Sequence, residues 1–275
     1  MALRAQQLKK GGLASRSIRD GSILPNKLSR LVNTAGYAIE PCNYQPRGST
    51  TDGFTDPSGA TGATNLLHWR DMVASYFILG AGQTLVLPTP DTVNGGLTFG
   101  LDLAAAEGHQ GVFGAMNTVT NPFAVTVGTS PNAFVRATFR AATVANAAEL
   151  ALGWRKAEAF QVNFDDYDEL AALNMQAGDI KRETILNGAA TVTVDTLLNA
   201  LDATDFTLEV RLIGRQALMF VNGAQAVIGV PFNFDVGEIV VPFYFWLQGG
   251  ASSALNLMDV EVGQLQAIQL DPARH

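Results

Sequence analysis

Carboxylates are the side chains of this sequence whose type and spacing come closest to a chemical function. The run Asp165-Asp166-Tyr167-Asp168-Glu169 holds four of them in five residues. Hard cations such as Ca²⁺ bind several carboxylate oxygens. The run is predicted to be a loop, however, in which neighbouring side chains diverge instead of converging. We interpret it as a solvated loop or a docking surface for basic segments, with a calcium site as the alternative.

No predicted strand carries three carboxylates at alternate positions, an arrangement that glycan cleavage could use. Cleavage of a glycosidic bond by a retaining mechanism needs two carboxyl groups about 5 Å apart. On a strand, side chains two residues apart lie on the same face. Asp259 and Glu261 share one strand face, but a third carboxylate at the same spacing is missing. We interpret both as the outer face of a sheet edge and expect no catalytic residues.

Nucleophile and metal chemistry find equally little support. His68, His109 and His275 are widely separated, and no Gly-x-Ser-x-Gly elbow occurs. The single cysteine, Cys42, excludes an internal disulfide and argues against a zinc site. It is predicted to be a buried thiol in a protein made in a reducing cytoplasm. The sequence therefore predicts no enzyme, no metal site and no cofactor. We expect the tryptophans to be core residues, with sugar stacking as the alternative: Trp69, Trp154 and Trp246.

Charge separates the chain into two parts. Residues 1–35 contain seven bases against one acid, a net of +6, so with −7 for the whole chain residues 36–275 carry −13. Apolar residues are interleaved with these bases, which favours docking in a protein groove over binding to nucleic acid. A solvated tail is the alternative. The residues predicted to contact a partner are Arg16, Ile18, Arg19, Ile23, Leu24, Lys27, Leu28 and Arg30.

Residues 1–64 lack the hydrophobic pattern that an independent core would need. Breaker signals recur throughout them, such as Gly11-Gly12, Pro41, Pro46 and the run 48–53. So long a stretch without regular structure is uncommon inside a compact domain. We predict an extended basic arm over residues 1–64, which becomes ordered on neighbouring subunits, and one folded domain over residues 65–275.

Short strands dominate the remainder. Residues 66–79 fit a helix or a strand, and the strand patterns after residue 84 favour a strand there too. Residues 197–201 are predicted to form one or two helical turns. No βαβ pattern occurs, so an antiparallel two-sheet β-sandwich is expected. The predicted strands are Thr84–Leu87, Leu97–Leu103, Ala124–Val127, Phe134–Phe139, Glu149–Arg155, Phe160–Phe164, Thr191–Val194, Phe206–Leu212, Ala217–Val221, Ala224–Ile228, Ile239–Leu247 and Leu257–Val262.

The clearest strand pair lies between residues 206 and 228. Apolar and polar residues alternate strictly through Phe206–Leu212, the pattern of a half-buried strand. Gly214 is expected to turn the chain, and Asn222-Gly223 is a strong hairpin signal. The side chains predicted to point inward are Phe206, Leu208, Val210, Leu212, Leu218 and Phe220.

This pair resembles the signature hairpin of concanavalin A-like and laminin-G-like jelly rolls. In that hairpin an aromatic-x-Leu-x-Val strand leads to Phe-x-Asn-Gly, here Phe206–Val210 and Phe220–Gly223. Residues 257–264 resemble the closing strand of the same fold. The resemblance implies the all-β fold. It leaves the function open, because the family includes lectins, glycanases and viral attachment modules.

A second resemblance lies in the arm. Residues 17–28 resemble the phrase Ile-x-Asp-Gly-x-Ile-x-x-x-Lys-Leu, found near the start of bacteriophage tail-fibre and virion-surface proteins. Together the two resemblances imply a structural virion protein, of the capsid decoration (cement) or fibre-base type. Its arm would anchor to the major capsid protein or other virion subunits, and the virion surface would be its location. The alternative is a carbohydrate-binding or glycan-cleaving module of a phage tail or fibre.

Low charge content bears on association. Only 16% of the residues are charged, below the roughly 25% usual for globular domains. Coverage of the surface by other subunits would explain this, as would a sandwich rich in small residues. The decoration-protein resemblance implies a homotrimer, and we expect its contact to include part of Pro231–Leu247. A host glycan remains a candidate partner, and a membrane is not expected.

Overall fold

The computed structural model describes residues 37–38, 64–68, 73–79, 84–90, 97–103, 108–114, 119–250, 253–264 and 266–267. The chain divides into two compact units. Residues 1–40 and 266–275 make up the first, in which β1 (Tyr37–Ala38) pairs with β19 (Gln266–Ala267). Residues 41–265 make up the second. The predicted boundary between arm and sandwich, at residue 64, stays a prediction.

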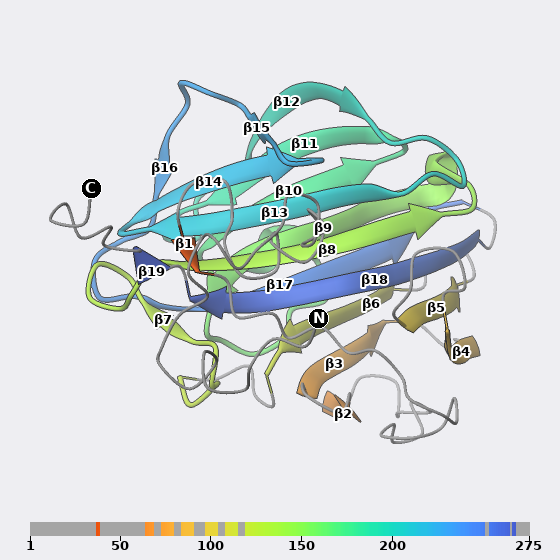
Figure 1. Cartoon of the computed structure of the whole chain (residues 1–275), viewed down its shortest axis with the longest axis horizontal. Coiled ribbons are helices and arrows are strands. Elements are labelled where there is room, and N and C mark those ends of the chain that lie inside the picture. Colours follow the sequence, from red (N-terminus) through yellow and green to blue (C-terminus); the bar gives the residue numbers. More distant parts are fainter. Residues whose placement is uncertain are drawn as a thin grey trace, which may run out of the picture. The chain divides into compact units, whose positions relative to one another are not determined.

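The second unit is an antiparallel two-sheet β-sandwich, as the sequence predicts (Figure 1). Its nine-stranded sheet has the order β12-β11-β10-β9-β17-β6-β3-β2, with β7 paired to β17. These strands are β12 (Val192–Asn199), β11 (Asp179–Ile185), β10 (Leu170–Gln176), β9 (Ala147–Lys156), β17 (Ile239–Gln248), β6 (Gly108–Phe113), β3 (Val73–Leu79), β2 (Thr64–His68) and β7 (Val125–Thr126).

The facing sheet has eight strands in the order β15-β14-β13-β8-β18-β5-β4, with β16 paired to β14. These strands are β15 (Ala224–Ala226), β14 (Gln216–Val221), β13 (Phe206–Ile213), β8 (Ala133–Ala141), β18 (Ser253–Gln264), β5 (Leu97–Leu103), β4 (Thr84–Pro90) and β16 (Phe232–Asn233). Two short 3-10 helices, η2 (Val144–Asn146) and η3 (Phe164–Asp166), lie in connections. No helix within the described part of the chain is long and apolar enough to cross a membrane.

The main core lies between the two sheets and is built from alternate residues of each strand. Trp154 is fully buried there and its indole Nε1 donates a hydrogen bond to the Val210 carbonyl of the facing sheet, at 3.0 Å. Trp246 is buried in the same core. Both tryptophans are therefore core residues, as expected, while Trp69 lies outside the described residues.

Turn chemistry is confirmed in the 206–226 region. Asn222 and Gly223 connect β14 to β15 with φ values of 50° and 80°, the left-handed conformations that a two-residue type I′ hairpin requires. Gly214 has φ 63° in the β13–β14 turn. Residues 64–68 and 73–79 form strands, which resolves the helix-or-strand ambiguity of residues 66–79.

Some sequence predictions are wrong. Residues 160–164 are not a strand, because their apolar side chains dock a loop onto a sheet face instead of alternating across one. Residues 197–199 belong to β12 and form no helical turn. Leu218 and Phe220 are only half-buried, since β14 turns Ala217, Met219 and Val221 inward.

The closing strand β18 also differs from its prediction. It spans Ser253–Gln264 and lies between β8 and β5, but its pairing with β5 covers only Ser253–Leu257. At Glu261 its paired neighbour is β8. Glu261 forms an ion pair with Arg136 of β8. The pairing of β18 with β8 shifts register between Met258 and Glu261. Such a bulge changes which residues of a strand face the core.

Buried within the main core, His109 of β6 stacks on Tyr244 with 5.6 Å between ring centroids. Desolvation lowers the pKa of His109 from 6.5 to about 3. As the pH falls below 6.5, the unfolded chain takes up a proton that the folded chain does not, so folding stability is lost progressively.

We therefore expect wild-type protein to lose about 2 kcal/mol between pH 8 and pH 5 through this residue alone. His109→Phe, which keeps a ring against Tyr244, should lack that loss. Denaturant unfolding of both proteins at the two pH values measures the difference. An identical pH dependence in the two proteins would show that His109 is not held neutral.

Candidate functional site

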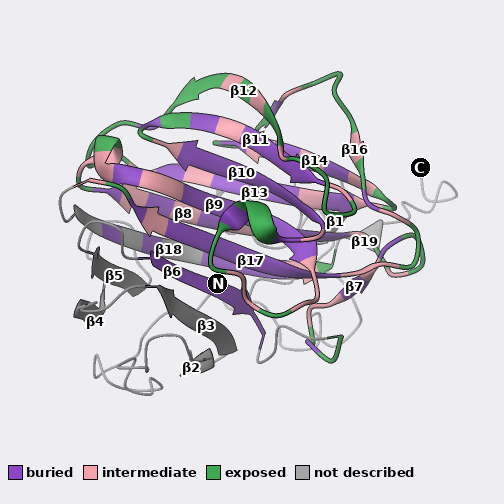
Figure 2. Cartoon of the chain, turned by 180° about the vertical axis from the view of Figure 1, so that it is seen from behind, coloured by how far each residue is buried: buried purple, intermediate pink, exposed green. Residues whose placement is uncertain are grey.

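A second apolar cluster lies on the outer face of the nine-stranded sheet, away from the main core. Figure 2 shows this face, with the buried strands β9, β10 and β17 across its centre. Residues 157–169 form a loop that is docked on it. Phe164 of the loop contacts Phe245 edge-on at 5.5 Å between centroids and Phe243 at 6.2 Å. The loop therefore covers one part of the outer face of the nine-stranded sheet. Polar side chains, described below, lie on another part of the same face.

Arg155 holds this loop from below and is fully buried. Its Nη1 donates to the carbonyls of Lys156 and Glu158, at 2.9 and 3.1 Å. Its guanidinium lies 4.5 Å from the centre of the Tyr167 ring. The phenol of Tyr167 in turn donates a hydrogen bond to Gln110 Oε1. These contacts give Arg155 a structural part, that of fixing the loop.

The acidic run that the sequence singled out lies in this loop, as predicted, and its side chains diverge. Asp165 accepts a hydrogen bond from Thr191 Oγ1 at 2.6 Å. Asp168 instead pairs with Lys156 at 2.6 Å, and Glu169 is buried. Burial is the main cause that raises the pKa of Glu169 to about 7. Within the described residues no group of three or more His, Cys, Asp or Glu is placed to hold a metal ion.

Beside the loop, four neighbouring strands place an ordered set of polar side chains on the same outer face. We call this set the Glu183 cluster. It comprises Glu149 of β9, Asn174 and Gln176 of β10, Lys181 and Glu183 of β11, and Thr193 of β12. Their positions follow from alternation, because the intervening residues Leu150, Met175 and Ile180 point into the main core.

Hydrogen bonds fix Glu183 at the centre of this cluster. Its carboxylate accepts from Asn174 Nδ2 at 2.6 Å, from Gln176 Nε2 at 3.0 Å and from Thr193 Oγ1 at 3.3 Å. Asn174 is oriented in its turn, since its Oδ1 accepts from the backbone N–H of Leu150 at 3.0 Å. Burial is the main cause that raises the pKa of Glu183, against the opposing effect of these donors.

Glu149 differs from Glu183 in being unsatisfied. Its Oε2 is buried without a hydrogen-bond partner. Burial first, and then the charges of Glu183 and Asp165, raise its pKa from 4.5 to about 7. A carboxyl group with such a pKa is present in both protonation states near neutral pH, so it can donate or accept a proton there.

The cluster is reachable from solvent on its β12 side. Thr193 is exposed, while Gln176 and Lys181 are half-buried. Lys181 Nζ donates to Gln176 Oε1 at 3.0 Å. Across from Glu149, the partly buried Leu247 of β17 adds an apolar surface. The outer face of the sheet therefore presents hydroxyl, amide, ammonium and carboxyl groups together, next to the apolar side chain of Leu247.

Sequence reasoning missed this cluster. The sequence feature that could have revealed it is a polar residue at every second position on either side of Gly178, at 174 and 176 and again at 181 and 183. β10 was not predicted as a strand because the docked loop buries its outer face as well. Leu170–Leu173 is therefore an unbroken apolar run without the alternation of a half-buried strand. The eight predicted arm residues, from Arg16 to Arg30, lie outside the described residues, as does Cys42.

No protein-family model matches the chain, and no curated protein matches it. Solved structures with similar folds include alginate lyase AlyC3, with 12% identity, a TM-score of 0.47, and coverage of 86% of this chain and 99% of that chain. They include the carbohydrate-binding module CBM66 from Bacillus subtilis (12% identity, TM-score 0.40, coverage 65% and 93%). Galectin LEC-6 from Caenorhabditis elegans is a third (16% identity, TM-score 0.33, coverage 52% and 91%).

The prediction that the chain is not an enzyme is contradicted, since alginate lyases are among the similar structures. At 10–12% identity the likeness itself shows the fold alone. The prediction also considered carboxylates along single strands only. β9 and β11 lie on either side of β10, so Glu149 and Glu183 come into electrostatic contact from distant positions in the sequence. The similar structures give no support to a bacteriophage capsid, a cement role or a homotrimer. The chain is an antiparallel β-sandwich of the jelly-roll type.

Proposed function

We propose that the outer face of the nine-stranded sheet binds a neutral, hydroxyl-rich glycan at the Glu183 cluster. The observation that carries this proposal is the row of ordered donors and acceptors around Glu183, open to solvent at Thr193. Sugar hydroxyl groups both donate and accept hydrogen bonds, and such a mixed row suits them. Leu247 offers an apolar surface for the ring of a sugar residue.

Charge narrows the class of ligand. Glu149 and Glu183, with the nearby Asp165, outnumber the one cation of the cluster, Lys181. A polyanion such as nucleic acid would meet like charges there, which disfavours its binding. A neutral glycan carries no such penalty.

Glycan cleavage is the second candidate function, and the state of Glu149 favours it. A carboxyl group with a pKa of about 7 and a free oxygen beside a ligand face has the properties of a general acid or base. In that case Glu149 would exchange a proton with the bound glycan, while Glu183, tied by three donors, would position and polarise it.

Binding to neutral polysaccharides tests the proposal. Lys181→Ala and Thr193→Ala each remove one polar group at the open side of the cluster, and each should weaken binding about three- to tenfold. Thr207→Ala, a half-buried threonine of β13 in the other sheet, is the matched control and should bind as wild type does. Affinity electrophoresis in gels containing neutral or acidic polysaccharide gives the comparison. Equal retardation of all four proteins would refute the proposed face.

The virion role, the homotrimer and the location on a capsid rest on the arm and remain predictions. Of the region expected to contribute to a trimer contact, residues 240–246 are buried within the fold itself. Exposed residues of that region, such as Val236, are left for such a contact. Glycan binding by the sandwich is compatible with anchoring by the arm.

A further inference from the structure

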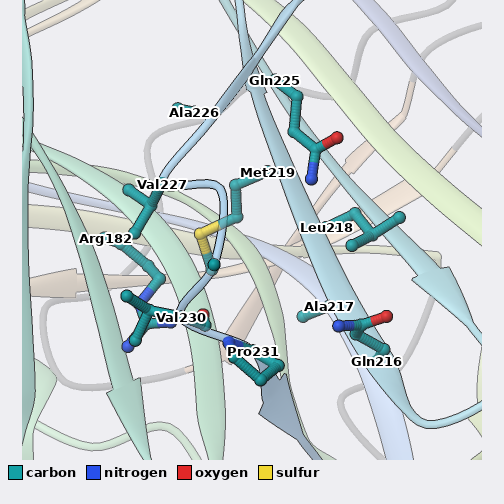
Figure 3. Close-up of a pocket in the computed structure, with 11 residues that line it drawn as sticks. Arg182, Gln216, Ala217, Leu218, Met219, Gln225, Ala226, Val227, Val230 and Pro231 are labelled. Carbon is teal, nitrogen blue, oxygen red and sulfur yellow. Dashed lines mark hydrogen bonds between the residues drawn. The ribbon is translucent and has the colours of Figure 1, made fainter.

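A separate pocket lies at the edge of the eight-stranded sheet, where the chain leaves β15 and returns as β16 (Figure 3). β14 pairs with β15 through Met219–Val221 and with β16 through Gln216–Ala217. Between these two ladders the segment 227–231 bows away from Leu218. The resulting cavity has a volume of about 270 Å³.

Arg182 of β11 reaches this pocket from the opposite sheet. Its exposed fraction is 5%. The Nη1 group donates a hydrogen bond to the Val230 carbonyl, whereas Nε is buried with no partner. No carboxylate among the described residues forms an ion pair with it. A buried cation without a counter-charge is costly to maintain in a fold.

The remaining walls show what kind of ligand would fit. Apolar atoms come from Ala217, Met219, Val227 and Pro231, and amide groups from Gln216 and Gln225. None of the lining residues is acidic. The pocket thus joins one guanidinium without a carboxylate partner among the described residues to an apolar wall and two neutral hydrogen-bonding groups, although the chain as a whole carries a charge of −7.

Backbone strain marks the segment that encloses the pocket. Val227 has φ 55°, a conformation in which a β-branched residue is a genuine outlier. Strained residues of this kind persist where the surrounding structure holds them, often at ligand sites. Val227 lines the pocket directly.

We propose that this pocket binds a small monocarboxylate with an apolar body, held by the guanidinium of Arg182. A single guanidinium with one N–H already used by Val230 matches one carboxylate better than a phosphate dianion, which would call for a second cation. The apolar body of the ligand would contact Met219, Val227 and Pro231. This site is independent of the glycan-binding face proposed above, because Arg182 and the Glu183 cluster lie on opposite faces of β11.

Titration with isovalerate and benzoate tests the site, followed through the Nε–H resonance of Arg182 and by calorimetry. We expect saturable binding with a Kd of about 1 mM or tighter. Arg182→Met keeps the apolar stem and should weaken binding at least tenfold while leaving the protein folded. Gln216→Glu adds an acid at the pocket and should have the same effect. Arg215→Met removes an exposed guanidinium from the β13–β14 turn and is the matched control, expected to bind as wild type does.

Three outcomes would overturn the proposal. Wild-type protein could show no saturable response to either acid up to about 10 mM. Arg182→Met could bind as tightly as the control. Inorganic phosphate could bind more tightly than both acids, which would refute the assignment to a monocarboxylate. Glycan binding is measured in a separate experiment. If the protein bound no glycan, the carboxylate titrations would still test this pocket.

Discussion

Phe164→Ala is expected to lower the free energy of unfolding by about 3–5 kcal/mol, the cost of truncating a buried phenylalanine. Phe164 is 2% exposed and is the residue that docks loop 157–169 on Phe243 and Phe245. Its loss leaves a cavity between the loop and the sheet. Chemical denaturation at pH 7 measures the change.

Phe164→Ala should also change the pKa of Glu149 in the candidate site. Asp165 follows Phe164 directly, and its charge contributes to the raised pKa of Glu149. Loosening of the loop should therefore lower the pKa of Glu149 toward its ordinary value, which carboxyl NMR titration would detect. Val162→Ala is the matched control, because Val162 belongs to the same loop but is 63% exposed. Its effect should stay within about 0.5 kcal/mol. Similar losses in the two variants would mean that Phe164 does not anchor the loop.

Glu149→Gln is expected to separate function from stability. The folded-state pKa of Glu149, about 7, lies above the ordinary value of 4.5, so the folded protein binds this proton more tightly than the unfolded chain does. The stability gained from the protonated form is complete below pH 4.5 and is lost as the pH rises to 7. Glutamine resembles the protonated form at every pH.

The variant should therefore match wild type at pH 4 and exceed its stability at pH 8 by about 3 kcal/mol. Glu209→Gln is the matched control on the other sheet. Glu209 is buried but paired with Arg211 at 2.5 Å, so its replacement should destabilise the protein at pH 8. A Glu149→Gln variant less stable than wild type at pH 8 would contradict the assignment of Glu149 as an unsatisfied carboxyl group.

Activity should change in the opposite direction to stability. If the face cleaves its glycan, Glu149→Gln should lower the rate of reducing-end release about 10²–10⁴-fold, the usual contribution of a general acid or base. If the face only binds, no release occurs in either protein, and affinity should lose its pH dependence near 7 in the variant. Unchanged release in a more stable variant would remove Glu149 from the chemistry. A Glu149→Gln variant that is more stable but less active would show the trade-off between stability and activity that is common at functional sites.

Short stretches of sequence were enough to predict the class of fold and the local turn geometry. Strict alternation in Phe206–Leu212 placed those four apolar residues in the core, because side chains of a strand point alternately to its two faces. Asn222-Gly223 specified its hairpin for a reason equally local, since few residue pairs adopt two left-handed conformations. The divergence of the carboxylates at 165–169 was likewise local information.

Which distant residues share a face depends on the tertiary structure. Phe160 and Phe164 have the pattern of a strand, yet they serve a loop, because apolar residues that dock a loop have the same composition as those of a buried strand. Glu149 and Glu183 belong to one cluster only because β10 lies between their strands. Arg182 is buried beneath the bowed segment 227–231 of the other sheet, and none of the residues that line its pocket is acidic. Strand order and burial set these relations, and neither is encoded within a few neighbouring residues.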